Sequence, residues 1–204
     1  MANRVNYPKL MDQAIQSLGG TRPRLLLHSC CAPCSSAVLE MLSQYFRITI
    51  LYYNPNIWPS LEYHRRVQEL ERFIQEAGLP DLELVVEDYH PEEYDQAVQG
   101  LEDCPERGDR CTVCYQMRME RTAAYAAAHG YEWFCSSLSI SPRKDAQRLN
   151  EMGQALEQKY GVRHLPNEFK RREGHKRSLE LSSQHNLYRQ EYCGCKHSAP
   201  KHMK

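Results

Sequence analysis

Short apolar segments alternate along the chain with longer segments in which apolar residues recur at helical spacing. The apolar segments predict strands over residues 24–29, 48–53, 82–87 and 133–137. The amphipathic segments predict helices over residues 35–44, 59–77, 91–99, 114–129, 141–160 and 174–185. We place the cap and first turn of the fifth helix at Ser141 and Pro142. Strands alternating with helices predict an α/β fold with a Rossmann-like parallel sheet and helices on both faces.

The sequence has 204 residues, a length that fits a single domain with a substantial buried core. The predicted α/β core covers about residues 24–160. Beyond it the pattern becomes a basic loop, one helix and an irregular tail, so residues 161–204 are predicted to form a C-terminal extension. Residues 1–20 are polar without a continuous apolar stretch, which predicts neither a secretory signal nor a membrane span. We therefore expect a cytoplasmic protein.

Seven of the nine cysteines fall into three short clusters. The clusters are Cys30, Cys31 and Cys34, then Cys111 and Cys114, then Cys193 and Cys195. The first cluster follows the first predicted strand, at the edge where open α/β sheets bind ligands. The second lies at the start of a predicted helix, whose amide groups favour thiolates. Such short spacings suit metal ligands better than disulfides. The sequence therefore predicts a metal centre in an active-site crevice, with its last ligands on the C-terminal extension.

The residue pattern leaves several kinds of metal centre open. Four thiolates in two pairs suffice for one structural zinc ion, but seven thiolates exceed a tetrahedral site. A four-cysteine iron–sulfur cluster beside three further cysteines uses all seven, and two zinc ions that share a thiolate also fit. Permanent disulfides are rare in a reducing compartment. We expect Cys135 to be a buried core thiol, Cys104 an incidental loop thiol and His28 a packed core histidine.

Basic and acidic side chains balance at 26 each, so the molecule as a whole does not attract a polyanion. Locally, residues 163–177 are rich in arginine, lysine and histidine. This run is a candidate phosphate-binding face. A solvated basic loop explains such a run equally well.

Five motifs together closely resemble one family. They are HSCCAPC at residues 28–34, YYNPNI at 52–57 with EY at 62–63 and RR at 65–66, RCTVCY at 110–115 with Arg118, LSISP at 138–142 and LYRQEYCGC at 187–195. Each motif alone is weak, but the combination is specific, and the resemblance runs from about residue 24 to residue 198. The family is that of the cobalamin-independent epoxyqueuosine reductases, called QueH.

The resemblance implies the last step of queuosine biosynthesis. In that step, two electrons and two protons reduce the epoxide of epoxyqueuosine at the wobble position of tRNA. The resemblance also implies a [4Fe-4S] cluster, an adjacent mononuclear metal ion, iron or zinc, and an external low-potential electron donor. Following it, we assign Cys31, Cys111, Cys114 and Cys193 to the cluster. We assign Cys30, Cys34 and Cys195 to the adjacent ion.

Further residues receive expected roles from this chemistry. The adjacent ion acts as a Lewis acid for the epoxide oxygen, and the cluster delivers electrons. Protons are needed for the oxygen to leave as water. By proximity to the motifs, the candidate proton donors are Tyr53, Glu62, Tyr63 and Tyr192.

Contacts with the anticodon are expected from aromatic and basic residues. Tyr52 and Tyr53 are candidates for stacking a splayed-out base, a common mode of RNA loop recognition. The tRNA backbone is expected to make salt-sensitive contacts with basic side chains. These are Arg65, Arg66, Lys170, Arg171, Arg172, Lys176 and Arg177.

We considered three alternative hypotheses for the function. A zinc-stabilised RNA-binding module would use the same thiols and basic face without catalysis. An ATP-dependent tRNA-modifying enzyme of similar topology would need a glycine-rich phosphate cradle, which the first strand-to-helix turn lacks. A thioredoxin-like exchange role for Cys111 and Cys114 leaves the other five clustered cysteines unexplained.

Overall fold

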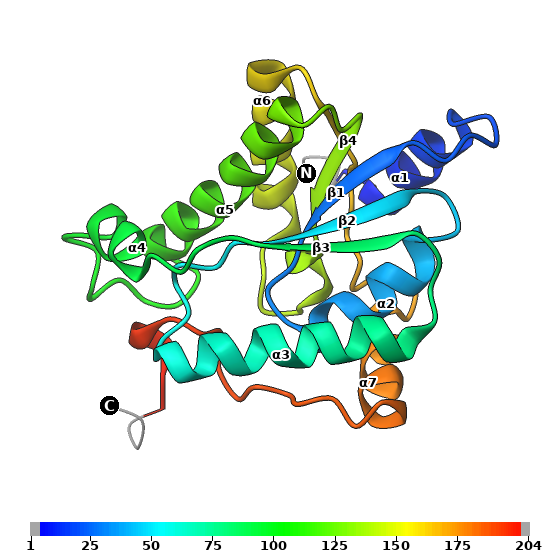
Figure 1. The fold of residues 1–204 in the computed structure, drawn as a ribbon. Coiled ribbons are helices and arrows are strands. Elements are labelled where there is room, and N and C mark those ends of the chain that lie inside the picture. The colour runs from blue at the N-terminus through cyan, green and yellow to red at the C-terminus, as the bar shows by residue number, and fades with distance from the viewer. Residues whose placement is uncertain (1–4, 201–204) are drawn as a thin grey trace.

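The computed structural model describes residues 5–200 and contains a parallel sheet (Figure 1). The strand order is β3-β2-β1-β4-β5, and every neighbouring pair is parallel. The strands are β1 (Arg24–His28), β2 (Arg47–Tyr52), β3 (Leu82–Val86), β4 (Trp133–Ser136) and β5 (Arg163–His164). The predicted Rossmann-like α/β fold is thereby confirmed. The short strand β5 was not predicted, because its two residues lie inside the basic run.

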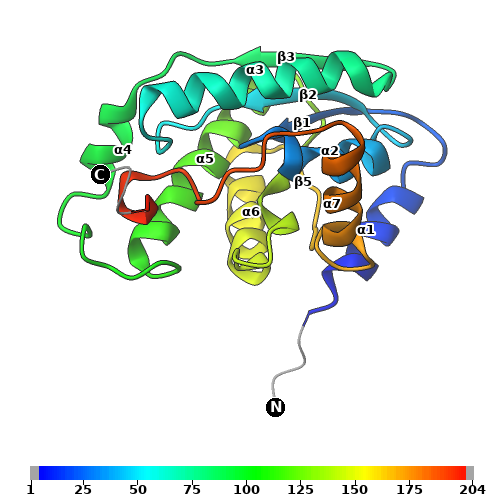
Figure 2. The ribbon, with the colours of Figure 1, turned by 90° about the horizontal axis from the view of Figure 1, so that it is seen from below.

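Helices cover both faces of the sheet (Figure 2). One face packs against α1 (Tyr7–Gln16), α2 (Ala32–Leu42) and α3 (Ser60–Ala77), and the other packs against α5 (Asp109–Ala128) and α6 (Ala146–Tyr160). Within β1, Leu25 and Leu27 point to the first face while Leu26 points to the second, and all three are fully buried. A strand buried on both faces needs this unbroken apolar run. The remaining helices are α4 (Pro91–Ala97), α7 (Gly174–Gln184), η1 (Ser137–Ile140) and η2 (Lys196–Ser198).

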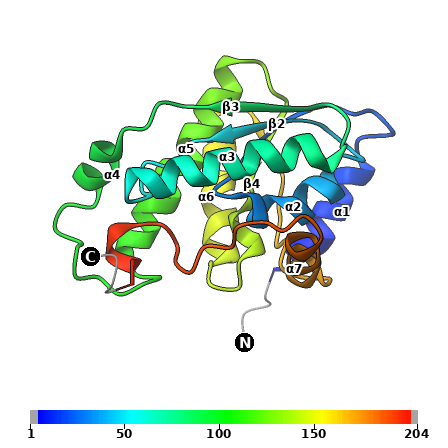
Figure 3. The same cartoon turned by 60° about the horizontal axis from the view of Figure 1, so that its bottom comes forward.

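The C-terminal segment crosses the molecule after α7, which packs against α2. It runs beside α3 and ends near α4 and the beginning of α5 (Figure 3). Its path is fixed by side chains of α3. Glu69 accepts a hydrogen bond from the backbone N–H of Tyr188 at 2.6 Å, and Arg72 donates to the carbonyl of His185 at 3.0 Å. The segment thereby carries Cys193 and Cys195 toward the helix that bears Cys111 and Cys114.

Several predicted boundaries are corrected by the structure. The predicted cap at Ser141 is wrong, because α6 begins at Ala146 and Asp145 is its N-cap. The Asp145 carboxylate accepts the Arg148 backbone N–H at 3.2 Å, and residues 141–144 are left as a loop. Helix α1 was not predicted, although Asn6 caps it by accepting the Lys9 N–H. The predicted domain limits reach residues 1–4 and 201–204, outside the described residues, and stay a prediction.

Candidate metal centre

The first three clustered thiols meet at the junction of β1 and α2. Cys31 is the N-cap of α2, and its sulfur accepts the backbone N–H of Cys34 at 3.3 Å. The sulfurs of Cys30, Cys31 and Cys34 all lie within 4.8 Å of one another, and those of Cys30 and Cys31 are 3.8 Å apart. Thiolates bound tetrahedrally to one ion at about 2.3 Å lie about 3.8 Å from each other. The spacing therefore fits the ligands of a single ion.

Ionisation of one thiol in this trio disfavours ionisation of the other two. Hydrogen bonds from Cys31 and Cys34 hold the pKa of Cys30 well below its usual range. Burial, with the neighbouring Cys30 thiolate, raises the pKa of Cys31 to about 12. Hydrogen bonding to Cys30 and Cys31 raises the pKa of Cys34. One thiolate thus suppresses ionisation of the other two thiols, and three thiolates can coexist when a bound cation offsets their charge.

Helix α5 presents its two cysteines in its first turns. The Cys111 sulfur accepts the Arg107 backbone N–H at 3.3 Å. The Cys114 sulfur accepts a hydrogen bond from the buried Arg118 guanidinium at 3.2 Å. Burial raises the pKa of the Cys114 thiol to about 11. Cys114 is therefore a protonated thiol near neutral pH unless a metal takes the place of its proton.

A buried ion pair positions the backbone that carries the last two clustered cysteines. Arg66 is 1% exposed and pairs with Glu62 at 2.7 Å. Its guanidinium also donates to the carbonyls of Cys193 at 3.3 Å and Tyr192 at 3.4 Å. Between the cysteines, Gly194 has φ +121°, and its carbonyl accepts the Trp58 N–H at 2.8 Å. Arg66 and Gly194 together set the direction of both thiols.

The close group of thiols holds Cys30, Cys31 and Cys34, and Cys195 lies outside it. Our division of the seven cysteines between a cluster and an adjacent ion stays a prediction. Cys195 packs with Cys114 beside Tyr94, where hydrogen bonds from Ser198 lower the pKa of its thiol although burial opposes this. The N-cap of α2 turns the Cys31 sulfur toward its neighbours in sequence.

Two buried cations use cysteine sulfurs as partners. Arg118 is 2% exposed and Lys144 is 7% exposed. Lys144 Nζ donates to the Cys193 sulfur at 2.8 Å, as Arg118 does to that of Cys114. Among the described residues neither cation pairs with a carboxylate. Buried charges require compensation, and the sulfurs of Cys114 and Cys193 are the atoms placed to supply it when they are ionised or bound to a metal.

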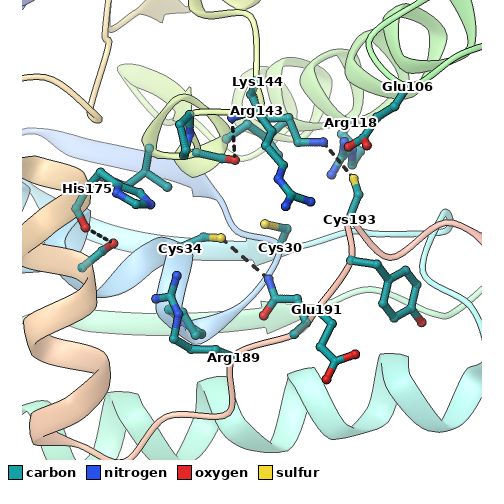
Figure 4. Close-up of a pocket in the computed structure, with 18 residues that line it drawn as sticks. Cys30, Cys34, Glu106, Arg118, Arg143, Lys144, His175, Arg189, Glu191 and Cys193 are labelled. Carbon is teal, nitrogen blue, oxygen red and sulfur yellow. Dashed lines mark hydrogen bonds between the residues drawn. The ribbon is translucent and has the colours of Figure 1, made fainter. Parts of the chain in front are cut away.

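A cavity of about 330 Å³ opens beside this centre (Figure 4). Cys30, Cys34 and Cys193 line it together with apolar side chains of η1. Gln190 also lines it and donates from its amide nitrogen to the Cys31 sulfur at 3.0 Å. The Gln190 carbonyl oxygen is buried and has no partner among the described residues. The predicted crevice at the carboxyl edge of the sheet is thus present.

The expected proton donors lie in different surroundings. Tyr192 lines the cavity, but its hydroxyl donates to the Trp58 carbonyl, and burial raises its pKa to about 12. The Tyr53 hydroxyl donates to Glu93 at 2.6 Å, and that of Tyr63 donates to the Glu87 carbonyl. Glu62 holds Arg66. Of these four side chains, Tyr192 alone contributes to the lining of the cavity.

The residues expected to bind RNA differ in their exposure and in their partners. Tyr52 and Arg66 are 0% and 1% exposed, so neither reaches an RNA in this structure. Arg65 is exposed and stacks on Tyr188, 3.4 Å from the ring centre. Lys170 donates to the Lys144 carbonyl, and four further basic residues of the 170–177 run make ion pairs. The pairs are Arg171 with Glu168, Arg172 with Asp12, Lys176 with Glu173, and Arg177 with Glu40 and Glu180.

The residues outside the clusters are as expected. Cys135 is fully buried in the core. Cys104 lies in the loop before α5, where its carbonyl accepts a hydrogen bond from Arg110. His28 is fully buried, donates from Nε2 to the Tyr53 carbonyl at 3.1 Å and accepts from Ser136 at Nδ1 at 2.9 Å. It is a packed core histidine with both ring nitrogens satisfied.

Sequence reasoning assigned no role to Arg118, Lys144, Gln190, Arg143 or Arg189, which all line the cavity. Arg118, Arg189 and Gln190 belong to the motifs quoted above, so proximity to the cysteines was an available signal. Arg143 and Lys144 carried no such signal, because they lie in a segment predicted as helix.

Comparison with known proteins gives one consistent family. A family model described as "Epoxyqueuosine reductase QueH" matches residues 25–201. A protein of that name from Streptococcus pyogenes is 40% identical over 201 residues, which cover 96% of this chain and 79% of the relative. The Haemophilus influenzae protein of that name is 42% identical over 177 residues, covering 86% of this chain and 71% of its own. One from Thermotoga maritima is 33% identical over 177 residues, covering 84% and 88%.

Proposed function

The chain belongs to the QueH family of epoxyqueuosine reductases, and we propose that it reduces epoxyqueuosine to queuosine in the anticodon of tRNA. The observation that carries the proposal is the thiol-lined cavity at the carboxyl edge of the sheet, with its two buried cations. The reaction takes two electrons from an external low-potential donor and two protons, and it releases the epoxide oxygen as water. Clustered reduced thiols and a tRNA substrate both favour a cytoplasmic location.

No helix of the described part of the chain is long and apolar enough to cross a membrane.

We propose that the seven clustered cysteines together hold a [4Fe-4S] cluster and an adjacent metal ion. The donor set fits these groups, because thiolates are the ligands that iron–sulfur clusters and soft metal sites prefer. When bound, the cluster supplies electrons and the adjacent ion supplies a Lewis acid for the epoxide oxygen. The division of the thiols between the two groups stays a prediction.

Lys144 is the side chain we propose to assist the departing oxygen. Its ammonium group lines the cavity and is held by the Cys193 sulfur. Burial alone would lower the pKa of Lys144, but its electrostatic interactions with Cys193 and Tyr115 raise the pKa, so the group stays cationic. A fixed cation stabilises negative charge that develops on oxygen and supplies a hydrogen bond to it. Tyr192, whose hydroxyl is already engaged with Trp58, contributes to the cavity wall.

Gln190 is placed to orient the substrate. Its amide nitrogen is fixed by Cys31, which leaves its carbonyl oxygen as a buried acceptor in the cavity wall. A hydroxyl or amine of the modified base would satisfy this acceptor. Leu138 and Ile140 of η1 supply apolar surface that excludes water from the reacting bond.

The direct test is turnover of tRNA that carries epoxyqueuosine. Anaerobically purified protein with dithionite as the electron donor is expected to convert the modified nucleoside to one that has lost a single oxygen atom. Cys30→Ser and Lys144→Met are expected to lower the rate by at least about 100-fold. Arg172→Ala, a change on the outer surface, is the matched control and is expected to retain the rate. Unchanged epoxyqueuosine with metal-replete wild-type protein would contradict the proposal.

One observation favours the second candidate, a zinc-stabilised RNA-binding module. The Cys30, Cys31 and Cys34 sulfurs have the spacing of ligands to a single ion. Zinc bound without sulfide, with RNA binding but no turnover, would establish this alternative.

A further inference from the structure

The basic run that first suggested an RNA-binding face has a structural role. Arg172 pairs with Asp12 of α1 at 2.7 Å, and Arg177 pairs with Glu40 of α2 at 2.7 Å. These pairs connect the run and α7 to α1 and α2, two of the three helices on that face of the sheet. Lys176 pairs with Glu173 at 3.2 Å. A cation already paired with a carboxylate gains less from a phosphate, because the first partner must be given up.

Two arginines at the mouth of the thiol-lined cavity lack such partners. Arg143 extends from the loop before α6, and Arg189 extends from the C-terminal segment on the opposite wall (Figure 4). Both side chains are exposed. In the part of the chain that the structure describes, neither makes an ion pair, and Arg189 donates only to the Ser182 hydroxyl at 3.0 Å. Of the two carboxylates that line the cavity, Glu191 points away from the thiols (Figure 4).

A second cavity adjoins the first and offers a flat stacking surface. The two share Arg189, Glu191 and Tyr192 in their linings. In the second, the Arg65 guanidinium lies 3.4 Å above the centre of the Tyr188 ring. Tyr188 is fixed by its hydroxyl, which donates to Glu62 at 3.0 Å, and by its backbone N–H, which donates to Glu69. The exposed side of a guanidinium fixed in this way is a surface on which nucleic-acid bases stack.

We propose that the anticodon loop crosses the molecule between these two cavities. The modified nucleotide occupies the thiol-lined cavity, Arg143 and Arg189 bind the phosphates on either side of it, and a neighbouring base stacks on Arg65. Guanidinium groups suit this role because they bind phosphate oxygens in a bidentate manner and stay charged. This RNA path rests on the proposed function, since it places the reacting nucleotide next to the metal centre. It excludes the 170–177 run as the main contact with the RNA backbone.

The test is binding of a fluorescent RNA hairpin with the sequence of a substrate anticodon stem and loop. The dissociation constant of the anaerobically purified full chain is measured over a series of KCl concentrations. Arg143→Ala and Arg189→Ala are each expected to weaken binding about 5- to 10-fold and to reduce the salt slope by about one. Arg189→Lys is expected to keep the slope. The controls, Arg172→Ala and Lys176→Ala, are expected to stay within about twofold of wild type.

The stacking contact needs its own pair of variants. Arg65→Lys keeps the charge but removes the planar group, so it is expected to weaken binding nearly as much as Arg65→Ala, about 5-fold or more. If Arg65→Lys binds like wild type, the stacking contact is overturned. If Arg172→Ala and Lys176→Ala weaken binding as much as Arg143→Ala and Arg189→Ala do, the RNA path is overturned. An unchanged melting temperature for each variant shows that folding is intact.

Turnover by the same wild-type preparation separates this inference from the proposed function. If the wild-type enzyme is active but Arg143→Ala and Arg189→Ala bind the RNA hairpin normally, the RNA path alone is contradicted. Enzyme that shows the expected binding pattern but leaves epoxyqueuosine intact contradicts the reductase alone.

Discussion

At the scale of single residues, the proposed metal centre depends on side chains that are not among its expected ligands. Arg66 is buried with Glu62 and uses its remaining donors on the backbone that carries Cys193. Breaking a buried ion pair leaves an uncompensated charge and costs several kcal/mol. Gly194 contributes equally, because its backbone conformation is one that L side chains rarely adopt. The thiols of the last cluster are therefore placed by an arginine and a glycine.

Replacing Gly194 by alanine is expected to damage both stability and metal binding. A Cβ there would lie 3.1 Å from Arg66 and 3.1 Å from Ile57, at φ +121°. We expect the free energy of unfolding to fall by about 1–3 kcal/mol and the iron content per chain to fall with it. The control is Gly100→Ala, which also has positive φ but open space around the Cβ. Equal iron content in Gly194→Ala and wild type would contradict the role of this glycine.

His164 gives the fold an acid-sensitive position far in sequence from the cysteine clusters. Its ring is buried, Nδ1 has no partner among the described residues, and burial lowers its pKa from 6.5 to about 3. The unfolded chain therefore binds a proton below pH 6.5 that the folded chain does not bind. Stability conferred by the neutral ring is full above pH 6.5 and is lost as the pH falls toward 3.

We expect His164→Phe to lessen the loss of stability on acidification. Between pH 6.5 and 5 the histidine contributes roughly 2 kcal/mol to that loss, at about 1.4 kcal/mol per pH unit. Urea unfolding of both proteins at the two pH values measures this difference, and the other titrating groups are common to both. Parallel changes in wild type and variant would show that His164 carries no such effect.

At the scale of elements, the loop before α6 is as important as the helices. Helix α6 begins late because Asp145 caps it, and this leaves residues 141–144 free to bring Arg143 and Lys144 to the cavity. Serine followed by proline is a common helix start, and aspartate four residues later is another. Local pattern does not rank such competing caps. The choice follows from the burial of Lys144 against Cys193, which is a long-range contact.

Removing the Asp145 cap is expected to have a limited effect. Asp145→Ala leaves the Arg148 N–H without its partner and should lower the free energy of unfolding by about 1 kcal/mol. Asp145→Asn keeps a side-chain acceptor and is the control, expected near wild type. Urea titration at constant pH distinguishes them. If Asp145→Asn loses as much stability as Asp145→Ala, the cap is not the source of the effect.

Most of the fold was predictable because it depends on local pattern. The apolar runs that became β1, β2, β3 and β4 lie within one residue of their predicted limits, since strands buried in a parallel sheet need continuous apolar sequence. Helix α1 and the strand β5 were missed. Helix α1 fully buries only Tyr7 and Met11, and β5 is two residues long. Neither carries a sequence signal strong enough to separate it from a loop.

At the scale of the whole molecule, the thiols come from three remote parts of the chain. The turn after β1, the beginning of α5 and the C-terminal segment converge beside one cavity. Cysteine spacing predicted the set of residues and the edge of the sheet. It did not predict that Arg172 and Arg177 would pair with carboxylates of α1 and α2. These pairs depend on tertiary contacts that cysteine spacing and local charge do not encode.

Removing the metal is expected to loosen the C-terminal segment first. In the proposed centre, bound groups would connect Cys193 and Cys195 to the other cysteines, and ligands that bind only the folded state stabilise it. Hydrogen exchange at residues 187–195 should become faster in chelator-treated protein, while the buried strand β1 keeps its protection. Equal exchange in loaded and stripped protein would show that the segment is held by protein contacts alone.

The central claim is that these thiols form a redox-active iron–sulfur centre. The most direct test is iron, sulfide and zinc analysis of one anaerobically purified sample, together with its visible spectrum. The account predicts about four or more iron atoms per chain, matching sulfide and broad absorption near ~400 nm. Zinc without sulfide, persisting after attempted reconstitution of the cluster, would contradict the account and establish the structural-zinc alternative.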